Sequence, residues 1–380
     1  MDVVPRASST NNDYLNFIKP IMKKTIVGTA YVLALSFLIT SCNKGGSSNQ
    51  VSNESRTGAI TEATAFGLIG FAAGTTGGAG GSTVTATTYS QLKSYLESST
   101  TYVVRVDRRI YNGTKGGRIN VNNNKTLLGV GSAGFLDGVG LNISSRSNII
   151  IQNIKITLTS ITDRSDPAVY DPDGDEGRPQ IIVNGGDCIS IQGSSSRIWI
   201  DHCEMYQVDP SVQTNQDLYD GLVDIKNSSR NITISWCYFH DHHKTHLVGS
   251  SDSDNYDRKI TFHHNYYRKV KERLPSYRFG LGHIFNNYYT LITGSAINSR
   301  MGACLKIENN YFESVKSPII SANSSTIGKW QVAGNYYTGI SGTQPPASST
   351  CSFTPPYSYS LDAVSTVKTE VTSKAGIGKL

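Results

Sequence analysis

The segment GHIFNNYY, residues 282–289, decides the fold, because it recurs along the chain. In each copy a run rich in β-branched residues leads through polar residues into a further short strand, as strands separated by turns do. The related segments are NIIIQNIKI (148–156), RIWIDHCEM (197–205), NITISWCYF (231–239), KITFHHNYY (259–267), LKIENNYF (305–312) and WQVAGNYY (330–337). Their equivalent positions, Ile154, Cys203, Cys237, Asn265, Asn287, Asn310 and Asn335, are 49, 34, 28, 22, 23 and 25 residues apart.

A strand repeat of about 22 residues predicts a solenoid, and specifically a parallel β-helix. A single coil cannot bury its own inner face, so stacked coils must share one continuous core. Equivalent side chains then lie above one another at the strand spacing of about 4.8 Å. The sequence therefore predicts an asparagine ladder and ladders of stacked aromatic rings. Cys203 and Cys237 fall in one column, where the spacing suits a disulfide and two stacked thiols equally.

The composition favours an all-β domain with little helix. The 380 residues include 36 Gly and 21 Tyr, and only 17% are charged. Thr88 followed by Gln91 is a capping box and predicts one short N-terminal helix. Helical spacing returns in a C-terminal tail that we expect to pack back on the solenoid: Leu361, Val364, Val367 and Val371, followed by Gly376.

The N-terminal residues have the pattern of export and tethering segments. Residues 22–41 combine lysines, an apolar run and a small-residue site, which predicts a secretory signal peptide. With the cysteine that follows, this segment resembles a bacterial lipoprotein signal in which Cys42 is lipidated. A plain signal peptide and a membrane anchor are the alternatives, although the apolar run is short for a span. We interpret residues 1–21 as an upstream extension or a misassigned start, 42–58 as a flexible tether, and 59–380 as the β-helix domain. The expected location is outside the cytoplasm, as a secreted protein or an outer-membrane lipoprotein that contacts the membrane only through its lipid.

Charge and cysteine usage exclude some classes of function. The formal net charge of +6 is compatible with an anionic substrate and too weak to indicate nucleic acid. The spacing of the remaining cysteines is unlike any C-x-x-C motif, and their odd number leaves at least one thiol free: Cys188, Cys203, Cys237, Cys304 and Cys351.

Three aspartates are expected to meet on neighbouring coils. Aligning IQGSSSRIWI with IKNSSRNITI places Ile191 over Ile225, so Asp187 becomes level with the segment from Asp220 to Asp224. Three carboxylates so close repel one another unless a cation lies between them, and an all-oxygen set suits Ca²⁺. The alternative is that they are turn aspartates that cap strands.

Two arginines flank a proline in RLPSYRFG, residues 273–280. The planar donor fork of arginine suits a ligand rich in carboxylates, so Arg273 and Arg278 are candidates for binding such a ligand. The alternative is a loop with two solvated arginines.

Several motifs, taken in order, resemble the pectate lyase/pectin lyase family of polysaccharide lyases. They are GFAAGTTGG (70–78), WIDH (199–202), DGLVDIKN (220–227), HDHHKTHLVGSS (240–251) and RLPSYRFG (273–280) followed by HIFNNYY. The resemblance extends from about Ala65 to Gly378. It implies a right-handed parallel β-helix and β-elimination of de-esterified homogalacturonan, with calcium between the enzyme and a substrate carboxylate.

The resemblance also implies roles for single residues. Asp187, Asp220 and Asp224 correspond to calcium ligands, although the family often has another acid at the position of Gly185 and a glutamate at 220, so we expect a weaker site. Lys244 and Arg278 correspond to substrate-binding cations. Arg273 corresponds to the residue that removes the C5 proton, after which the C4–O4 bond breaks and leaves a 4,5-unsaturated end. A guanidinium is a poor base. The alternative is therefore that a water molecule held by Arg273 removes the proton. If Arg273 itself is the base, an alkaline optimum of activity is expected.

Three further motifs are interpreted as structural or as part of the surface. The histidines of HDHHKTH should point to different faces of a strand and turn, which disfavours a zinc site and favours exposed, stacked rings. Asp201 and His202 lie away from the three aspartates in the coil alignment. The acidic loop DPDGDEG, residues 171–177, lacks the glycine and the glutamate that an EF-hand needs at its later positions, so we expect a surface loop flanking the substrate cleft.

Other classes of function fit the sequence less well than a calcium-dependent pectate lyase. A calcium-independent pectin lyase should lack the three aspartates, and a polygalacturonase would need its own paired catalytic carboxylates. A non-catalytic β-helix that binds polysaccharide would have the same ladders, but it has no reason to combine the aspartates with Lys244, Arg273 and Arg278. The sequence therefore predicts a monomeric, calcium-dependent pectate lyase acting on polygalacturonate.

Overall fold

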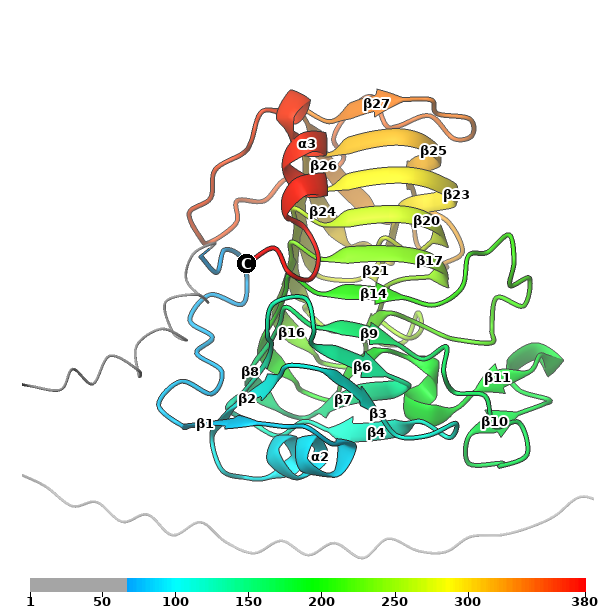
Figure 1. Ribbon diagram of the computed structural model, residues 1–380. Coiled ribbons are helices and arrows are strands. Elements are labelled where there is room, and N and C mark those ends of the chain that lie inside the picture. Colours follow the sequence, from blue (N-terminus) through cyan, green and yellow to red (C-terminus); the bar gives the residue numbers. More distant parts are fainter. Residues whose placement is uncertain (1–66) are drawn as a thin grey trace, which may run out of the picture. The chain divides into compact units, whose positions relative to one another are not determined.

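The computed structural model describes residues 67–380, and the predictions for residues 1–58, including Cys42, lie outside the described residues. Among residues 67–380, no helix has both the length and the apolar character needed to span a membrane. The described chain forms a stack of coils whose strands run in parallel (Figure 1). This confirms the predicted right-handed parallel β-helix.

One face of the solenoid, called face A, is a sheet of ten parallel strands. In spatial order they are β1 (Ser82–Thr85), β2 (Tyr102–Val106), β5 (Lys125–Gly129), β8 (Ser147–Gln152), β13 (Ser196–Asp201), β16 (Arg230–Ser235), β19 (Lys259–His263), β22 (Leu281–Phe285), β24 (Cys304–Glu308) and β26 (Lys329–Ala333). Strands adjacent in space come from successive coils, as the repeat requires.

Two further faces belong to one sheet of fifteen strands, because its longest strand turns the corner between them. Face B contains β3 (Arg109–Tyr111), β6 (Phe135–Asp137), β9 (Lys155–Thr157), β14 (Glu204–Tyr206), β17 (Tyr238–Lys244) and β20 (Tyr266–Glu272). Face C contains β4 (Gly117–Asn120), β7 (Val139–Ser144), β12 (Ile189–Gln192), β15 (Val223–Ile225), β18 (Leu247–Val248) and β21 (Ser276–Arg278). Strand β23 (Tyr288–Arg300) pairs with β20 through its first residues and with β21 through its last. Strands β25 (Tyr311–Ile320) and β27 (Tyr336–Thr338) continue the stack.

The remaining elements are short. An antiparallel pair, β10 (Tyr170–Asp171) and β11 (Gln180–Ile181), projects from the solenoid (Figure 1). Two 3₁₀ turns cover Asp175–Gly177 and Val183–Gly186. Helix α2 (Tyr89–Glu97) begins after Thr88, whose hydroxyl accepts the Gln91 N–H, and the buried side chains of Leu92 and Leu96 pack into the core. The predicted short helix is therefore confirmed.

Helix α3 (Val364–Lys374) packs on face B, as the tail prediction required (Figure 1). Its buried Val367 and Val371 contact Tyr288 of β23. Leu361, which we expected in the same helix, lies before its first turn and is 38% exposed. Gly376 follows the helix with φ of 95°, a conformation that favours glycine at this position.

The asparagine ladder forms as predicted. The side-chain oxygen of Asn287 accepts the backbone N–H of Asn265 at 2.9 Å and its side-chain N–H at 3.0 Å. The same pair of bonds links Asn287 to Asn310, and Asn310 to Asn335. Because Asn265, Asn287 and Asn310 are buried, these bonds satisfy polar groups that the turns would otherwise leave unpaired.

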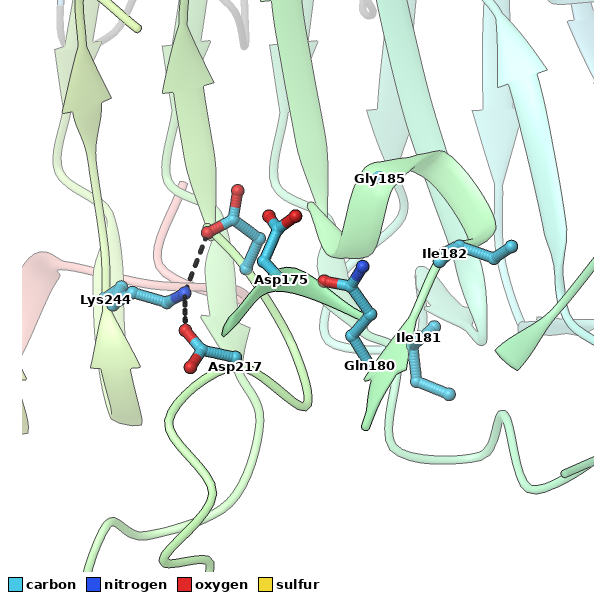
Figure 2. A pocket seen from close by; sticks show the side chains of 8 residues that line it. Asp175, Gln180, Ile181, Ile182, Gly185, Asp217 and Lys244 are labelled. Carbon is cyan, nitrogen blue, oxygen red and sulfur yellow. Dashed lines mark hydrogen bonds and ion pairs between the residues drawn. The ribbon is translucent and has the colours of Figure 1, made fainter. Parts of the chain in front are cut away.

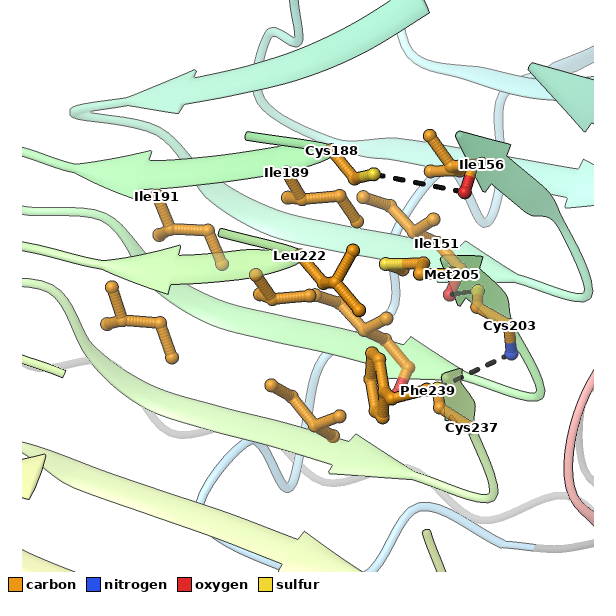
Figure 3. Packing of buried hydrophobic residues seen from close by; sticks show 14 of the residues in the cluster. Ile151, Ile156, Cys188, Ile189, Ile191, Cys203, Met205, Leu222, Cys237 and Phe239 are labelled. Carbon is orange, nitrogen blue, oxygen red and sulfur yellow. Dashed lines mark hydrogen bonds between the residues drawn. The ribbon is translucent and has the colours of Figure 1, made fainter. Parts of the chain in front are cut away.

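Aromatic rings stack beside this ladder. The ring centroids of Tyr267 and Tyr289 are 4.8 Å apart, and those of Tyr289 and Phe312 are 4.6 Å apart, with nearly parallel planes. Farther down the stack the interior is aliphatic, with isoleucines of successive coils in contact (Figure 3). Cys203 and Cys237 are free thiols in this interior, and the Cys203 N–H donates to the Cys237 sulfur at 3.4 Å. The alternative of two stacked thiols is therefore the one that the structure contains.

A disulfide that the sequence did not reveal joins Cys304 of β24 to Cys351 of the tail, across 47 residues. It fastens the segment after β27 to the solenoid, where Thr350 N–H also bonds to Trp330 O. Closing a loop of this length in the unfolded chain is worth about 4 kcal/mol in the chain-entropy account.

We expect Cys351→Ser to lower the melting temperature by several degrees, because the unfolded chain gains the freedom that the cross-link removed. Thermal unfolding followed by circular dichroism measures the effect. A reducing agent should lower the wild-type protein to the level of the variant and leave the variant unchanged. Equal melting of the oxidised wild-type protein and the variant would show that the cross-link contributes nothing to stability.

Candidate active site

The three predicted aspartates meet where face C begins. The register Ile191↔Ile225, which the sequence alignment anticipated, places β12 beside β15. One carboxylate oxygen from each of Asp187, Asp220 and Asp224 lies within 4.8 Å of the others, and among residues 67–380 no other such group of acids, histidines or cysteines occurs. The structure therefore brings together the residues that the sequence predicted as metal ligands.

Backbone N–H groups hold two of these carboxylates in place. Gly221 N–H donates to Asp187 Oδ1 at 2.8 Å, and Leu247 N–H donates to Asp224 Oδ1 at 3.0 Å. Both side chains are almost fully buried, whereas that of Asp220 is 33% exposed. A Cβ atom on Gly221 would lie 2.1 Å from Asp224 Oδ1, so only glycine leaves room for the cluster.

A lysine lies among the three carboxylates. The Lys226 ammonium is 3.1 Å from Asp224 Oδ2, 3.3 Å from Asp187 Oδ2 and 3.9 Å from Asp220 Oδ2. Burial, followed by the nearby Asp224 charge, raises the pKa of Asp187 well above its usual value. Burial alone would lower the pKa of Lys226, but the carboxylates of Asp224 and Asp187 outweigh it and raise that pKa. The carboxylates of the cluster therefore hold a cation, the Lys226 ammonium.

Lys244, at the end of β17, lies beside this cluster (Figure 2). Its ammonium is 2.9 Å from Asp217 Oδ1 and 3.0 Å from Asp220 Oδ1. A cavity of about 190 Å³ opens next to it, lined by Asp175, Gln180, Ile181, Ile182, Gly185, Asp217, Asp220 and Lys244. Asp175 belongs to the acidic loop of residues 171–177, which therefore flanks the site as expected.

The two predicted arginines differ in how they are held. Arg278, in β21, donates from Nε to Asp252 Oδ1 at 2.8 Å and from Nη1 to Gly249 O at 2.8 Å. Arg273 follows β20, and its nearest carboxylate oxygens, on Asp220 and Glu272, are 3.9 and 4.0 Å away. Its side chain is 28% exposed. The Arg273 guanidinium is therefore partly exposed and more loosely paired than that of Arg278.

A third arginine, Arg300, lies above Arg278 because β21 and β23 pair in register at these positions. Its Nη2 is 3.9 Å from Asp252 Oδ1. Burial, followed by the charge of Arg278, lowers the pKa of Arg300 to about 10. Lys244 and Arg273 lie where face B passes into face C, whereas Arg278 and Arg300 lie at the opposite end of the face C strands, so the four cations border this face.

The histidines have a structural role, but our expectation of exposed rings was wrong for three of the four. His242 and His246 are buried and donate to the carbonyl oxygens of Asp220 and Val223, at 2.7 and 3.2 Å. Burial lowers the pKa of each to about 3, so both are neutral near pH 7. His243 is also buried and bonds to Gln213 O. Only His240 is partly exposed, stacked between Tyr206 and Tyr238.

These contacts explain why the histidine-rich strand adjoins the acidic cluster. The rings of His242 and His246 fasten the backbone that leads into Asp224, at Asp220 and at Val223. Asp201 and His202 are likewise buried within face A, where Asp201 accepts hydrogen bonds from Ser235 and Gln152, in agreement with their interpretation as structural.

Sequence reasoning missed four charged residues of the site. Lys226 follows Asp224 by two residues, so strand alternation could have placed it on the same side. Arg300 occurs one repeat after Arg278, so the repeat could have placed it beside Arg278. Asp217 and Asp252 lie in irregular loops between strands, where no period indicates position.

A parallel β-helix with an acidic cluster and four cations bordering one face has the features of a β-helical enzyme for an acidic polymer. The chain belongs to the pectate lyase family, whose sequence profile matches residues 52–380. It is therefore a polysaccharide lyase, as the sequence predicted.

Individual relatives agree with this assignment. A pectate trisaccharide-lyase of Bacillus licheniformis is 44% identical over 324 residues, which cover 83% of this chain and 87% of the relative. Pectate lyase B of Colletotrichum gloeosporioides is 35% identical, covering 81% and 85% of the two chains. The crystal structure of a pectate lyase from Bacillus sp. N165 in complex with trigalacturonate superposes with a TM-score of 0.70 at 33% identity, covering 82% of this chain and 99% of that one.

Proposed function

We propose that this lyase cleaves de-esterified homogalacturonan by β-elimination with Ca²⁺ as cofactor. The observation that carries the proposal is the meeting of three aspartates with Lys244 and Arg273 at one open corner of the solenoid. The donor set fits the ion, because it consists of oxygens only, and two of the three carboxylates are buried and fixed by backbone N–H groups. Three side chains leave further coordination positions for water or substrate oxygens.

The residues of the chain divide the chemistry as follows. Asp187, Asp220 and Asp224 would hold calcium, which neutralises the substrate carboxylate and stabilises the charge that develops beside it. Lys244 and Arg278 bind and orient neighbouring carboxylates of the polymer. Arg273, whose side chain is 28% exposed, takes the C5 proton, directly or through a water that it holds. The C5–H electron pair then forms the C4=C5 double bond as the C4–O4 bond breaks, and O4 leaves with the preceding sugar and takes up a proton from water.

The test of this function is the ultraviolet absorbance of the unsaturated product on polygalacturonate at alkaline pH. We expect absorbance to rise with added Ca²⁺ and to stop rising when a chelator is added. A rise that continues in chelator, or occurs only on methyl-esterified pectin, would assign the protein to calcium-independent pectin lyases. Absence of any rise with folded protein on both substrates would favour a binding scaffold.

We also propose that the protein is exported as a monomer, secreted or anchored at the outer membrane by lipid on Cys42. Two features support export: the signal-like residues 22–41 and the disulfide Cys304–Cys351, since disulfides persist in oxidising compartments. Metabolic labelling with a fatty acid should mark the wild-type protein and leave Cys42→Ala unlabelled.

A further inference from the structure

Lys226 occupies the space between the three aspartates. Its ammonium contacts Oδ2 of Asp224, Asp187 and Asp220 at 3.1, 3.3 and 3.9 Å. We propose that Lys226 is a resident cation of this cluster, which must move out before a divalent ion can bind. The inference rests on the proposed calcium dependence, and it concerns what the chain itself does in the absence of metal.

The geometry does not allow both cations in the same place. Calcium binds oxygen at 2.3–2.6 Å, and the oxygens that could reach it are the ones that surround the ammonium. An ammonium and a divalent cation at such short range also repel each other strongly in a partly buried site. Entry of the metal therefore requires the ammonium to leave the three carboxylates.

The side chain of Lys226 has a route out, whereas its backbone is fixed. It is 22% exposed, unlike the buried carboxylates of Asp187 and Asp224. Both backbone polar groups of the next residue are hydrogen-bonded. Asn227 N–H donates to Asp254 Oδ2 at 2.9 Å, and Asn227 O accepts from Arg258 Nη2 at 2.7 Å. Rotation of the flexible lysine stem is therefore the movement that the structure permits.

A resident ammonium has two consequences of opposite sign. It offsets the repulsion of carboxylates that are held close together and buried, and so it stabilises the protein without metal. It also competes with the metal, and so it weakens calcium binding. Lys226→Met removes the charge and keeps most of the stem, which makes it the variant of choice.

We expect Lys226→Met to bind Ca²⁺ at least ten-fold more tightly than the wild-type protein in isothermal titration calorimetry. In chelator the variant should melt at a lower temperature than the wild-type protein, and saturating Ca²⁺ should raise its melting temperature by a larger increment. Lys259→Met is the matched control: Lys259 is 39% exposed and pairs with Asp257 at 3.0 Å on face A, so it changes net charge equally without touching the cluster. It should bind Ca²⁺ like the wild-type protein.

Departure of the ammonium can be measured directly by amine labelling. Reductive methylation followed by peptide mass mapping should modify Lys226 slowly in chelator and several-fold faster in Ca²⁺, at matched ionic strength. Lys368 of α3, which pairs with Glu313 of β25, should react equally in both conditions.

The outcomes separate this inference from the function on which it rests. The resident-cation inference is overturned if Lys226→Met binds Ca²⁺ no more tightly than the wild-type protein. It is also overturned if the rate of Lys226 labelling is the same with and without Ca²⁺. Either result leaves the proposed function intact. Failure of the wild-type protein to bind Ca²⁺ at all overturns the calcium part of the function and the inference with it.

Discussion

Arg273→Lys is expected to reduce turnover on polygalacturonate by about 10²–10⁴-fold, the range that a lost proton-transfer group costs. Among the cations that the sequence predicted, Arg273 is the one for which residues 67–380 place no carboxylate at hydrogen-bond distance, since the nearest oxygens are 3.9 and 4.0 Å away. Arg278 and Lys244 are already bound at 2.8–3.0 Å. Lysine keeps the positive charge at position 273 but lacks the planar guanidinium. The substitution therefore removes the fixed arrangement of N–H groups and leaves the charge unchanged.

The rate should fall in kcat, with KM and calcium affinity close to wild-type, because Lys244 and Arg278 still bind the polymer. Arg230→Lys, at an exposed position on face A, is the control and should keep full activity. Turnover within a few-fold of wild-type in Arg273→Lys would remove Arg273 from the proton transfer.

The repeat explains why many residues of this site could be predicted from the sequence. Stacking at a fixed spacing converts a distance along the chain into a position in space, so Ile191 and Ile225 could be aligned before the structure, and Asp187 with Asp224 followed. The same logic gave the column from Asn265 to Asn335.

This reasoning does not locate residues in the loops and the tail, which lie outside the repeat. It also does not tell which side chains on a strand are buried. Asp217 and Asp252 reach Lys244 and Arg278 from irregular loops, and the partner of Cys304 lies in a tail without coils. The histidines were misjudged for another reason. Their period placed them on different faces, but the carbonyls that the buried rings meet, those of Asp220, Val223 and Gln213, cannot be located from that period.

Asp224→Asn is expected to raise the calcium concentration needed for half-maximal activity by more than about 100-fold, since loss of outer-shell partners alone costs 10–100-fold in metal affinity. Asparagine has the same shape and can still accept the Leu247 N–H that Asp224 now accepts at 3.0 Å, so the fold should persist. At low Ca²⁺ the variant should be inactive, and excess Ca²⁺ should restore part of the rate. Asp257→Asn removes an equal charge from a residue whose side chain is 66% exposed and should not change the calcium titration.

Asp224 and Lys226 are two residues apart and in contact at 3.1 Å, yet removing their charges should change calcium affinity in opposite directions. Asp224→Asn removes a ligand, whereas Lys226→Met removes a competitor for the same oxygens. The double variant should therefore bind Ca²⁺ more tightly than Asp224→Asn alone. An unchanged calcium titration in Asp224→Asn would remove Asp224 from the metal site, and the argument for a lysine that competes there would lose its basis.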